Sequence, residues 1–463
     1  MTTTETRRWP GYGAVWRWHF YAGLFCIPFV LWLASTGSIY LFREEIEHFL
    51  DRPYAQVAAT GAAKPAADQV AAAVAAVPGS VLHTYIVPET PQEAVQILVG
   101  VEARQTRVYV NPNSLSILKT EDEDTRPMQI LFRLHGELRA GAAGSYIVEL
   151  AASWAIVMIL SGLFLWWPRS QGLAGVLYPR FGSGGRRFWR DIHAVTGLWV
   201  SVFALFLLIS GLPWAKSWGT YLRGIRAVVE RTVGPQDWSG GAEADASARK
   251  AEDSEIRAVI DVHAEHMGHT PAQHAAMAYG PIDRIIEVVR PVQLAPPVLI
   301  TPPRAADGRW GVRSDAANRP LRTDLVIDGA TGALVSRKDF AQRAFADRLV
   351  GYGVAAHEGK LFGIANQVIG LLTAIGLIAV TISSVVLWWR RKPAEFLGAP
   401  PVAGRHPVAA GFIALMILLG ALLPLLGASM ILVLIAEAVA LRRLPKTRTW
   451  LGLATTSTPQ KPA

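Results

Sequence analysis

Four long apolar stretches constrain this chain more than any other feature of its sequence. They cover residues 20–42, 147–167, 194–214 and about 362–389. A helix needs roughly 20 mostly apolar residues to cross the hydrocarbon core of a bilayer. Only 17% of the 463 residues are charged, whereas a typical soluble chain carries about 25%. The sequence therefore predicts a membrane protein, with the lipid bilayer as its partner, and not a nucleic-acid-binding protein.

A fifth apolar block runs over residues 407–441 and is interrupted by Pro424. One helix of about 35 residues would overshoot the bilayer, and a proline inside a helix kinks or ends it. We therefore expect two short helices in a hairpin, about six spans in all, and both termini on one side of the membrane.

The distribution of Lys and Arg predicts which side that is. Residues 1–19, 168–192, 390–406 and 442–463 together carry a net charge of +14, whereas residues 43–146 carry −4. Because short cytoplasmic loops are enriched in Lys and Arg, both termini are expected to be cytoplasmic. Residues 43–146 and 215–356 are then expected to lie outside. This asymmetry accounts for the net charge of +9.

Both outer segments have the pattern of small α+β modules. In the first we expect a helix over 66–77 and strands over 94–100, 107–110 and 115–118. In the second, after a flexible linker at 234–252, we expect a helix over 253–267 and strands over 285–289, 298–301, 325–327 and 333–336. The predicted fold is an all-α membrane bundle with two outer α+β modules.

An internal duplication carries four histidines. His19 and His193 each begin the pattern His-x-x-x-Gly-Leu followed by an aromatic residue. A hydroxyl residue and a glycine follow at the same distance in both halves, as Thr36–Gly37 and Ser210–Gly211. His135 and His357 each precede a Trp-Trp pair by the same distance, with a serine 26 residues on, at Ser161 and Ser383. Gap-free spacings in both pairs indicate a duplicated unit of span, outer module and span.

The repeat sorts the histidines into two layers, with His19 and His193 near the cytoplasmic face and His135 and His357 near the outer face. Histidines at membrane depth point to function, and a pair on facing helices can supply both axial nitrogens of a haem iron. We therefore expect two bis-histidine b-type haems. Gly23 and Gly197 would leave room for the macrocycle, and Glu137 and Glu358 would orient an imidazole N–H or contact a propionate. The single cysteine, Cys26, excludes covalent c-type attachment.

Other interpretations stay open. The histidines can serve helix packing instead, or hold a single haem or a metal without haem. A second cluster, His263, His266 and His269, lies on the helix predicted in the second module; it is either a solvated helix face or an additional metal site. His48 and His83 are expected at the surface.

The sequence resembles the PepSY-associated transmembrane family, also described as iron-regulated membrane proteins. The resemblance covers about residues 10–395. It is carried by His19 with Gly23, by Leu-His-Gly-Glu-Leu at 134–138, by Asp-Ile-His-Ala-Val-Thr-Gly at 191–197, by His-Glu-Gly-Lys-Leu-Phe-Gly at 357–363, by the span ends at 166–169 and 388–391, and by the hairpin at 326–332.

Some members of that family are haem-containing siderophore reductases of the bacterial inner membrane. The resemblance thus implies electron transport across the membrane to a periplasmic Fe(III)-siderophore, with release of Fe(II) for iron uptake. No cytoplasmic loop is long enough for a nicotinamide or flavin domain, so the electron donor would be quinol or a separate cytoplasmic reductase. A non-enzymatic iron-chelate binding or permease component, and a regulatory PepSY membrane protein, are the alternatives.

Overall fold

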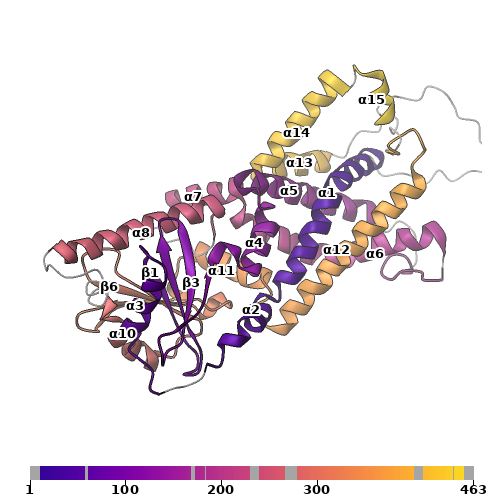
Figure 1. Ribbon diagram of the computed structural model, residues 1–463. Helices are drawn as coiled ribbons and strands as arrows, with labels where there is room; N and C mark the ends of the chain where they lie inside the picture. The colour runs from indigo at the N-terminus through magenta and orange to yellow at the C-terminus, as the bar shows by residue number, and fades with distance from the viewer. Residues whose placement is uncertain are drawn as a thin grey trace, which may run out of the picture. The chain divides into compact units, whose positions relative to one another are not determined.

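Four helices in the computed structural model are long and apolar enough to cross a membrane (Figure 1). They are α1 (Tyr12–Tyr40), α5 (Gly141–Trp166), α6 (Gly185–Gly211, continued by the 3-10 turn Leu212–Trp214) and α12 (Ile364–Arg391). They cover the four apolar stretches of the sequence. The structure describes residues 11–57, 61–167, 173–182, 184–229, 239–265, 279–400, 410–441 and 443–452.

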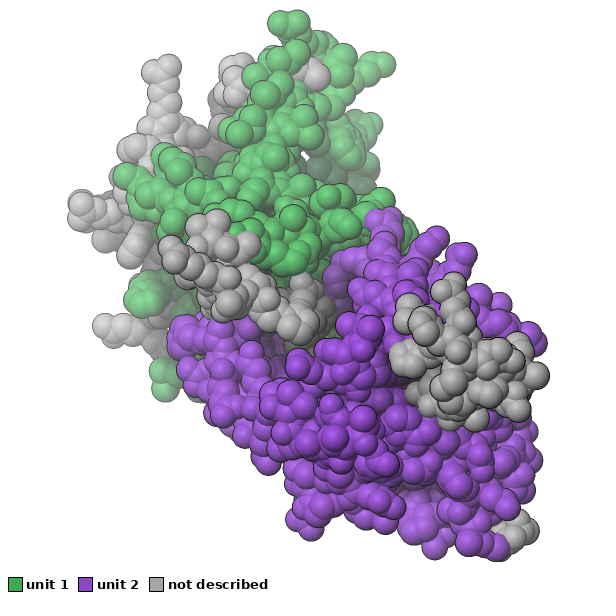
Figure 2. Space-filling view, turned by 90° about the vertical axis from the view of Figure 1, so that its left-hand side faces the viewer, with its two compact units in different colours: residues 1–38, 135–233, 368–463 green, residues 39–134, 234–367 purple. Residues whose placement is uncertain are grey.

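The chain forms two compact units, each built from separate parts of the sequence (Figure 2). Unit 1 contains residues 1–38, 135–233 and 368–463, and so holds most of the apolar helices. Unit 2 contains residues 39–134 and 234–367.

The C-terminal apolar block forms two helices in unit 1, α13 (Ala410–Leu422) and α14 (Pro424–Ala436), separated at the proline as expected. Each has 13 residues, or about 20 Å of helix, which is short of the roughly 30 Å hydrocarbon core. A total of six spans is therefore not confirmed. Trp154 of α5 donates to Ser429 of α14 at 3.1 Å and anchors the hairpin. A π-helical turn (Glu437–Leu441) and α15 (Pro445–Trp450) follow.

Glu149 is an acid inside the apolar helix α5, only 3% exposed. Its carboxylate accepts the backbone N–H groups of Ser217 and Trp218, at 2.8 and 3.1 Å, in the first turn of α7 (Lys216–Val229). The first N–H groups of a helix have no partner within the helix, and a negative charge is favoured there. Glu149 therefore caps α7, which explains a buried charge in an otherwise apolar segment.

Unit 2 is built on one antiparallel sheet of eight strands in the order β4-β3-β2-β1-β5-β6-β7-β8. The first module supplies β1 (Val81–Val87), β2 (Val95–Val101), β3 (Arg104–Val110) and β4 (Ile117–Asp122). The second supplies β5 (Val298–Thr301), β6 (Arg309–Ser314), β7 (Thr323–Asp328) and β8 (Leu334–Asp339). The fold is thus mixed helix and sheet, and the two expected modules share one sheet through the β1–β5 pair, where Tyr85 lies opposite Ile300.

The helices of unit 2 repeat in the same way. The first module contains α2 (Arg43–Asp51), α3 (Ala66–Ala76) and α4 (Pro127–Glu137), the last reaching into unit 1. The second contains α8 (Ala242–Glu265), α10 (Ile282–Val289) and α11 (Phe345–His357). In each module a helix precedes four strands, and a helix ending at or near a histidine follows them.

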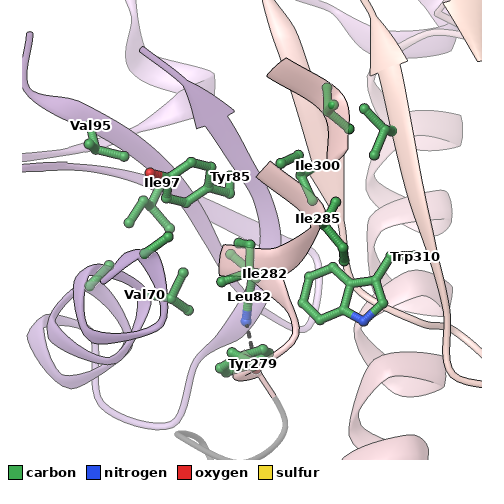
Figure 3. Packing of buried hydrophobic residues seen from close by; sticks show 14 of the residues in the cluster. Val70, Leu82, Tyr85, Val95, Ile97, Tyr279, Ile282, Ile285, Ile300 and Trp310 are labelled. Carbon is green, nitrogen blue, oxygen red and sulfur yellow. Dashed lines mark hydrogen bonds between the residues drawn. The ribbon is translucent and has the colours of Figure 1, made fainter. Parts of the chain in front are cut away.

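A single hydrophobic core joins the two modules (Figure 3). Val70 of α3 and Ile285 of α10 pack against Ile97 of β2 and Trp310 of β6 in one cluster. The hydroxyl of Tyr279 also accepts the backbone N–H of Leu82 in β1, at 3.0 Å. Burial of this shared apolar surface is the main favourable term for holding the two halves together.

Several local predictions were wrong. Residues 285–289, expected as a strand, belong to helix α10. Residues 242–252, expected as a linker, form the first part of α8. Strands β1 and β6 were not anticipated. The expected strand 298–301 coincides with β5, and the expected helix 66–77 differs from α3 by one residue.

His83 is fully buried, not at the surface as expected. Its Nε2 lies 3.3 Å from the carboxylate of Asp253 in α8, and Arg257 donates to the same carboxylate at 2.7 Å. The ring lies directly over Gly100 of β2, where any Cβ would fall on the ring atoms. This His–Asp–Arg group, in which His83 and Asp253 are buried, fastens α8 to the first half of the sheet.

We predict that Gly100→Ala destabilises the protein by about 1–3 kcal/mol, the usual range for overpacking a buried site. The new methyl group must displace the ring of His83 from Asp253. The measurement is the unfolding midpoint of the full-length protein in detergent. Gly224→Ala in α7 is the control, because a Cβ there meets no atom within 4 Å; equal midpoints for the two variants would contradict the packing described.

Candidate haem-binding site

His19 of α1 and His193 of α6 face each other within unit 1. Their ring centroids are 6.3 Å apart and their planes are inclined at 79°. Both rings are partly exposed. The structure therefore brings together the two histidines that the repeat placed in one layer.

Each of these imidazoles is held by the second long helix of its own half. Nδ1 of His19 lies 3.0 Å from the carbonyl oxygen of Met158 and 3.0 Å from the hydroxyl of Ser161, both in α5. Nδ1 of His193 lies 3.1 Å from the carbonyl oxygen of Val380 and 3.4 Å from the hydroxyl of Ser383, both in α12. The four partners occupy equivalent positions in the two repeats.

These contacts determine which ring nitrogen carries the proton. A carbonyl can only accept. The hydroxyl of Ser161 donates its proton to Met158, at 3.0 Å, and that of Ser383 donates to Val380, at 2.8 Å. Nδ1 must therefore be the donor, which leaves a lone pair on Nε2. Within the described part of the chain neither Nε2 has a hydrogen-bond partner, so in the neutral rings both Nε2 lone pairs are available to a ligand.

This donor set fits a bis-histidine haem. Two imidazoles on one metal, each with a bond of about 2 Å and a ring radius of about 1.1 Å, have centroids about 6 Å apart. The observed centroid separation of 6.3 Å matches that spacing, with the two rings edge-on to each other. An Nδ1–H donated to a protein oxygen is also the usual arrangement for a metal-bound histidine, because it sets the tautomer and the ring orientation.

His135 of α4 belongs to the same unit and is held in the same way. Its Nδ1 lies 2.9 Å from the hydroxyl of Thr36 in α1, and that hydroxyl donates to the carbonyl of Trp32 at 2.8 Å. Burial lowers the pKa of His135 to about 4, so the ring is neutral at physiological pH. It also carries its proton on Nδ1 and has Nε2 available for a ligand.

His357 is the last residue of α11 in unit 2, whereas His135 belongs to unit 1. The hydrogen bond from Asn366 of α12 to the carbonyl of Ala356, 2.9 Å, ties the end of α11 to the first turn of the next helix. Burial raises the pKa of the neighbouring Glu358, although Arg319, Arg43 and Arg322 oppose the shift. The assignment of His135 and His357 to one haem stays a prediction from the repeat.

The two predicted small residues face the neighbouring span of their own half. A Cβ on Gly23 would lie 3.8 Å from Sδ of Met158, and one on Gly197 would lie 4.0 Å from Val380. Both distances are ordinary contacts, so their proposed role beside a macrocycle stays a prediction. Glu137 is buried at the end of α4.

A buried ion pair beside His193 was missed by sequence reasoning. Asp191, fully buried, accepts from Arg180 at 2.6 and 2.8 Å and from Arg190 at 2.7 Å. Trp199 also donates to the carbonyl of Leu177 at 2.9 Å. These contacts fasten residues 173–182 to the start of α6. In the sequence these arginines are indistinguishable from the other basic residues of the loop. Only the folded structure shows that Arg180 and Arg190 both donate to the carboxylate of Asp191.

The histidine cluster predicted in the second module, His263, His266 and His269, falls on residues whose side chains the structure does not describe. His266 and His269 lie outside the described residues, as does the side chain of His263. Among the residues that the structure does describe, no group of three His, Cys, Asp or Glu side chains is placed to hold a metal.

The model of the PepSY-associated transmembrane region matches residues 16–391 of the chain. The chain belongs to the PepSY-associated transmembrane family. Membership is consistent with the four apolar helices and makes this a membrane protein of the iron-regulated type. No curated protein matches the sequence. The match contains all four repeated histidines.

We predict that Asp191→Asn loosens residues 173–182, because the guanidinium of Arg180 loses its bidentate partner. Trypsin should then cleave after Arg180 several-fold faster than in the unchanged protein, since cleavage follows local opening. Mass spectrometry of the released peptides measures the rate. Glu395→Gln, at an exposed position with no ion pair in the described structure, is the control; equal cleavage in all three proteins would count against the clamp.

Proposed function

We propose that this protein is a haem-containing reductase that passes electrons across the membrane to an Fe(III)-siderophore. The observation that carries the proposal is the pair of neutral imidazoles, His19 and His193, each with Nδ1–H bound to its own half and Nε2 free to ligate. The pair lies on two apolar helices, where an unexplained histidine points to function.

Two haems are proposed, both of the b type. His19 and His193 would hold the first, and His135 and His357 the second, the latter by analogy through the repeat. Bound haem supplies a one-electron Fe(III)/Fe(II) couple, whose potential depends on the axial ligands and on burial. The chain itself contributes the neutral tautomers, the spacing of the rings and the apolar surroundings. Glu137 and Glu358 are the candidate carboxylates beside the second pair.

The substrate chemistry requires only one electron for each iron. Siderophores hold Fe(III) through hard oxygen donors, and Fe(II) matches those ligands less well. Reduction therefore releases iron as Fe(II) and leaves the chelator intact. We place the protein in the bacterial inner membrane with both termini cytoplasmic, on the charge distribution of its loops. The electron donor would be quinol or a separate cytoplasmic reductase.

We predict that the detergent-purified protein shows the sharp reduced α-band of b-type cytochromes, with about two haems per chain. Absorption spectra of the oxidised and reduced protein, with a haem assay against protein concentration, provide the measurement. A folded, colourless preparation would sink the proposal and favour a chelate-binding or regulatory protein instead.

We predict that replacing one histidine removes one haem. His193→Ala should reduce the haem content by about half, because an iron with one axial imidazole is held weakly. His357→Ala should likewise remove the other haem and abolish reduction of an Fe(III)-siderophore, followed by trapping Fe(II) with a coloured chelator. His48→Ala, at an exposed residue of α2, should change neither; full haem content in both ligand variants would refute the assignment.

A further inference from the structure

A hydroxyl residue followed by a small residue lies against each of three histidines in unit 1. Thr36–Gly37 lies against His135, Ser161–Gly162 against His19 and Ser383–Ser384 against His193. We infer that these pairs are positioning residues that fix the tautomer and rotation of each imidazole and thereby set the strength of the iron ligand. The inference rests on the proposed haem function and adds these hydroxyl residues and their small neighbours to the residues that support the haem.

The hydroxyl oxygen can act only as an acceptor toward the histidine. Its one proton is already donated to a carbonyl one turn earlier in its own helix, to Trp32, Met158 or Val380 at 2.8, 3.0 and 2.8 Å. In each pair the hydroxyl oxygen therefore accepts the hydrogen bond from the Nδ1–H of the histidine. An imidazole that donates from Nδ1 is a more basic ligand through Nε2, and its ring cannot flip without breaking that bond.

The small neighbour makes room for the ring. A Cβ on Gly37 would lie 3.2 Å from Cε1 of His135, and one on Gly162 would lie 3.0 Å from Cε1 of His19. Both distances are tighter than ordinary contacts. In the second half the equivalent residue is Ser384, and there the distance from the hydroxyl to Nδ1 is the longest of the three, 3.4 Å. The glycine thus lets the ring approach its acceptor.

The three histidines differ in how many acceptors their Nδ1–H has besides the hydroxyl. His19 and His193 also have a backbone carbonyl as a second acceptor. For His135, Thr36 is the only hydrogen-bond partner of Nδ1 in the described structure. Ser210, the counterpart of Thr36 in the other half, likewise directs its hydroxyl proton to its own helix, at Phe206. Removal of Thr36 is therefore the sharpest test.

Thr36→Val keeps the shape of the side chain and removes the acceptor, whereas Thr36→Ser retains a hydroxyl. In full-length protein with ¹⁵N-labelled histidine, the Nδ1–H signal of His135 should lose protection from exchange in the valine variant alone. The midpoint potential of one haem should rise, because a less basic ligand stabilises Fe(III) less, and haem affinity should fall about 10-fold. The serine variant should match the unchanged protein.

A valine variant with an unchanged Nδ1–H signal and an unchanged potential would overturn the inference. If the valine variant does not fold, Gly162→Ala tests the same idea at His19, with Gly411→Ala, whose Cβ meets no atom within 4 Å, as its control. Only the first should weaken haem binding and disturb the His19 signal. A folded protein without haem would defeat the proposed function, and the Nδ1–H signal would still decide whether the hydroxyls orient the rings.

Discussion

The hydrogen bond from an imidazole Nδ1–H to the neighbouring long helix of the same half is the interaction on which the candidate site depends. His19 is oriented by α5 and His193 by α12, so each half prepares one imidazole independently. The pair arises only because α1 and α6 bring the two rings to 6.3 Å. A duplicated half without its partner would present one oriented histidine and no bis-histidine site.

In unit 2 the two halves are joined by strand pairing and apolar packing instead of by contacts between histidines and helices. There the halves meet through the β1–β5 ladder and a shared apolar core that contains residues of both α3 and α10. An isolated four-stranded module would leave the inner edges of β1 and β5 unpaired, and unpaired edges are prone to aggregation. Pairing the two modules removes both edges at once, so the duplication is stabilised by the sheet itself.

Sequence reasoning located what depends on spacing and missed what depends on long-range packing. The four apolar helices, the pairing of His19 with His193 and strand β5 follow from hydropathy and the repeat. Strand β1 does not follow from the pattern because His83 interrupts the apolar run Val81–Val87, and the burial of His83 requires Asp253, which is 170 residues away. Residues 285–289 were read as a strand because Ile and Val favour strands, yet tertiary packing places them in α10.

The two halves differ in the residue that follows the hydroxyl and in the distances from Nδ1 to its acceptors. Gly162 in the first half corresponds to Ser384 in the second, whose hydroxyl donates to Thr381 at 2.7 Å. His19 has two acceptors at 3.0 Å, whereas His193 has a carbonyl at 3.1 Å and a hydroxyl at 3.4 Å. The contacts around Nδ1 of His19 are therefore shorter than those around Nδ1 of His193, and donation from Nδ1 makes an imidazole a more basic ligand through Nε2.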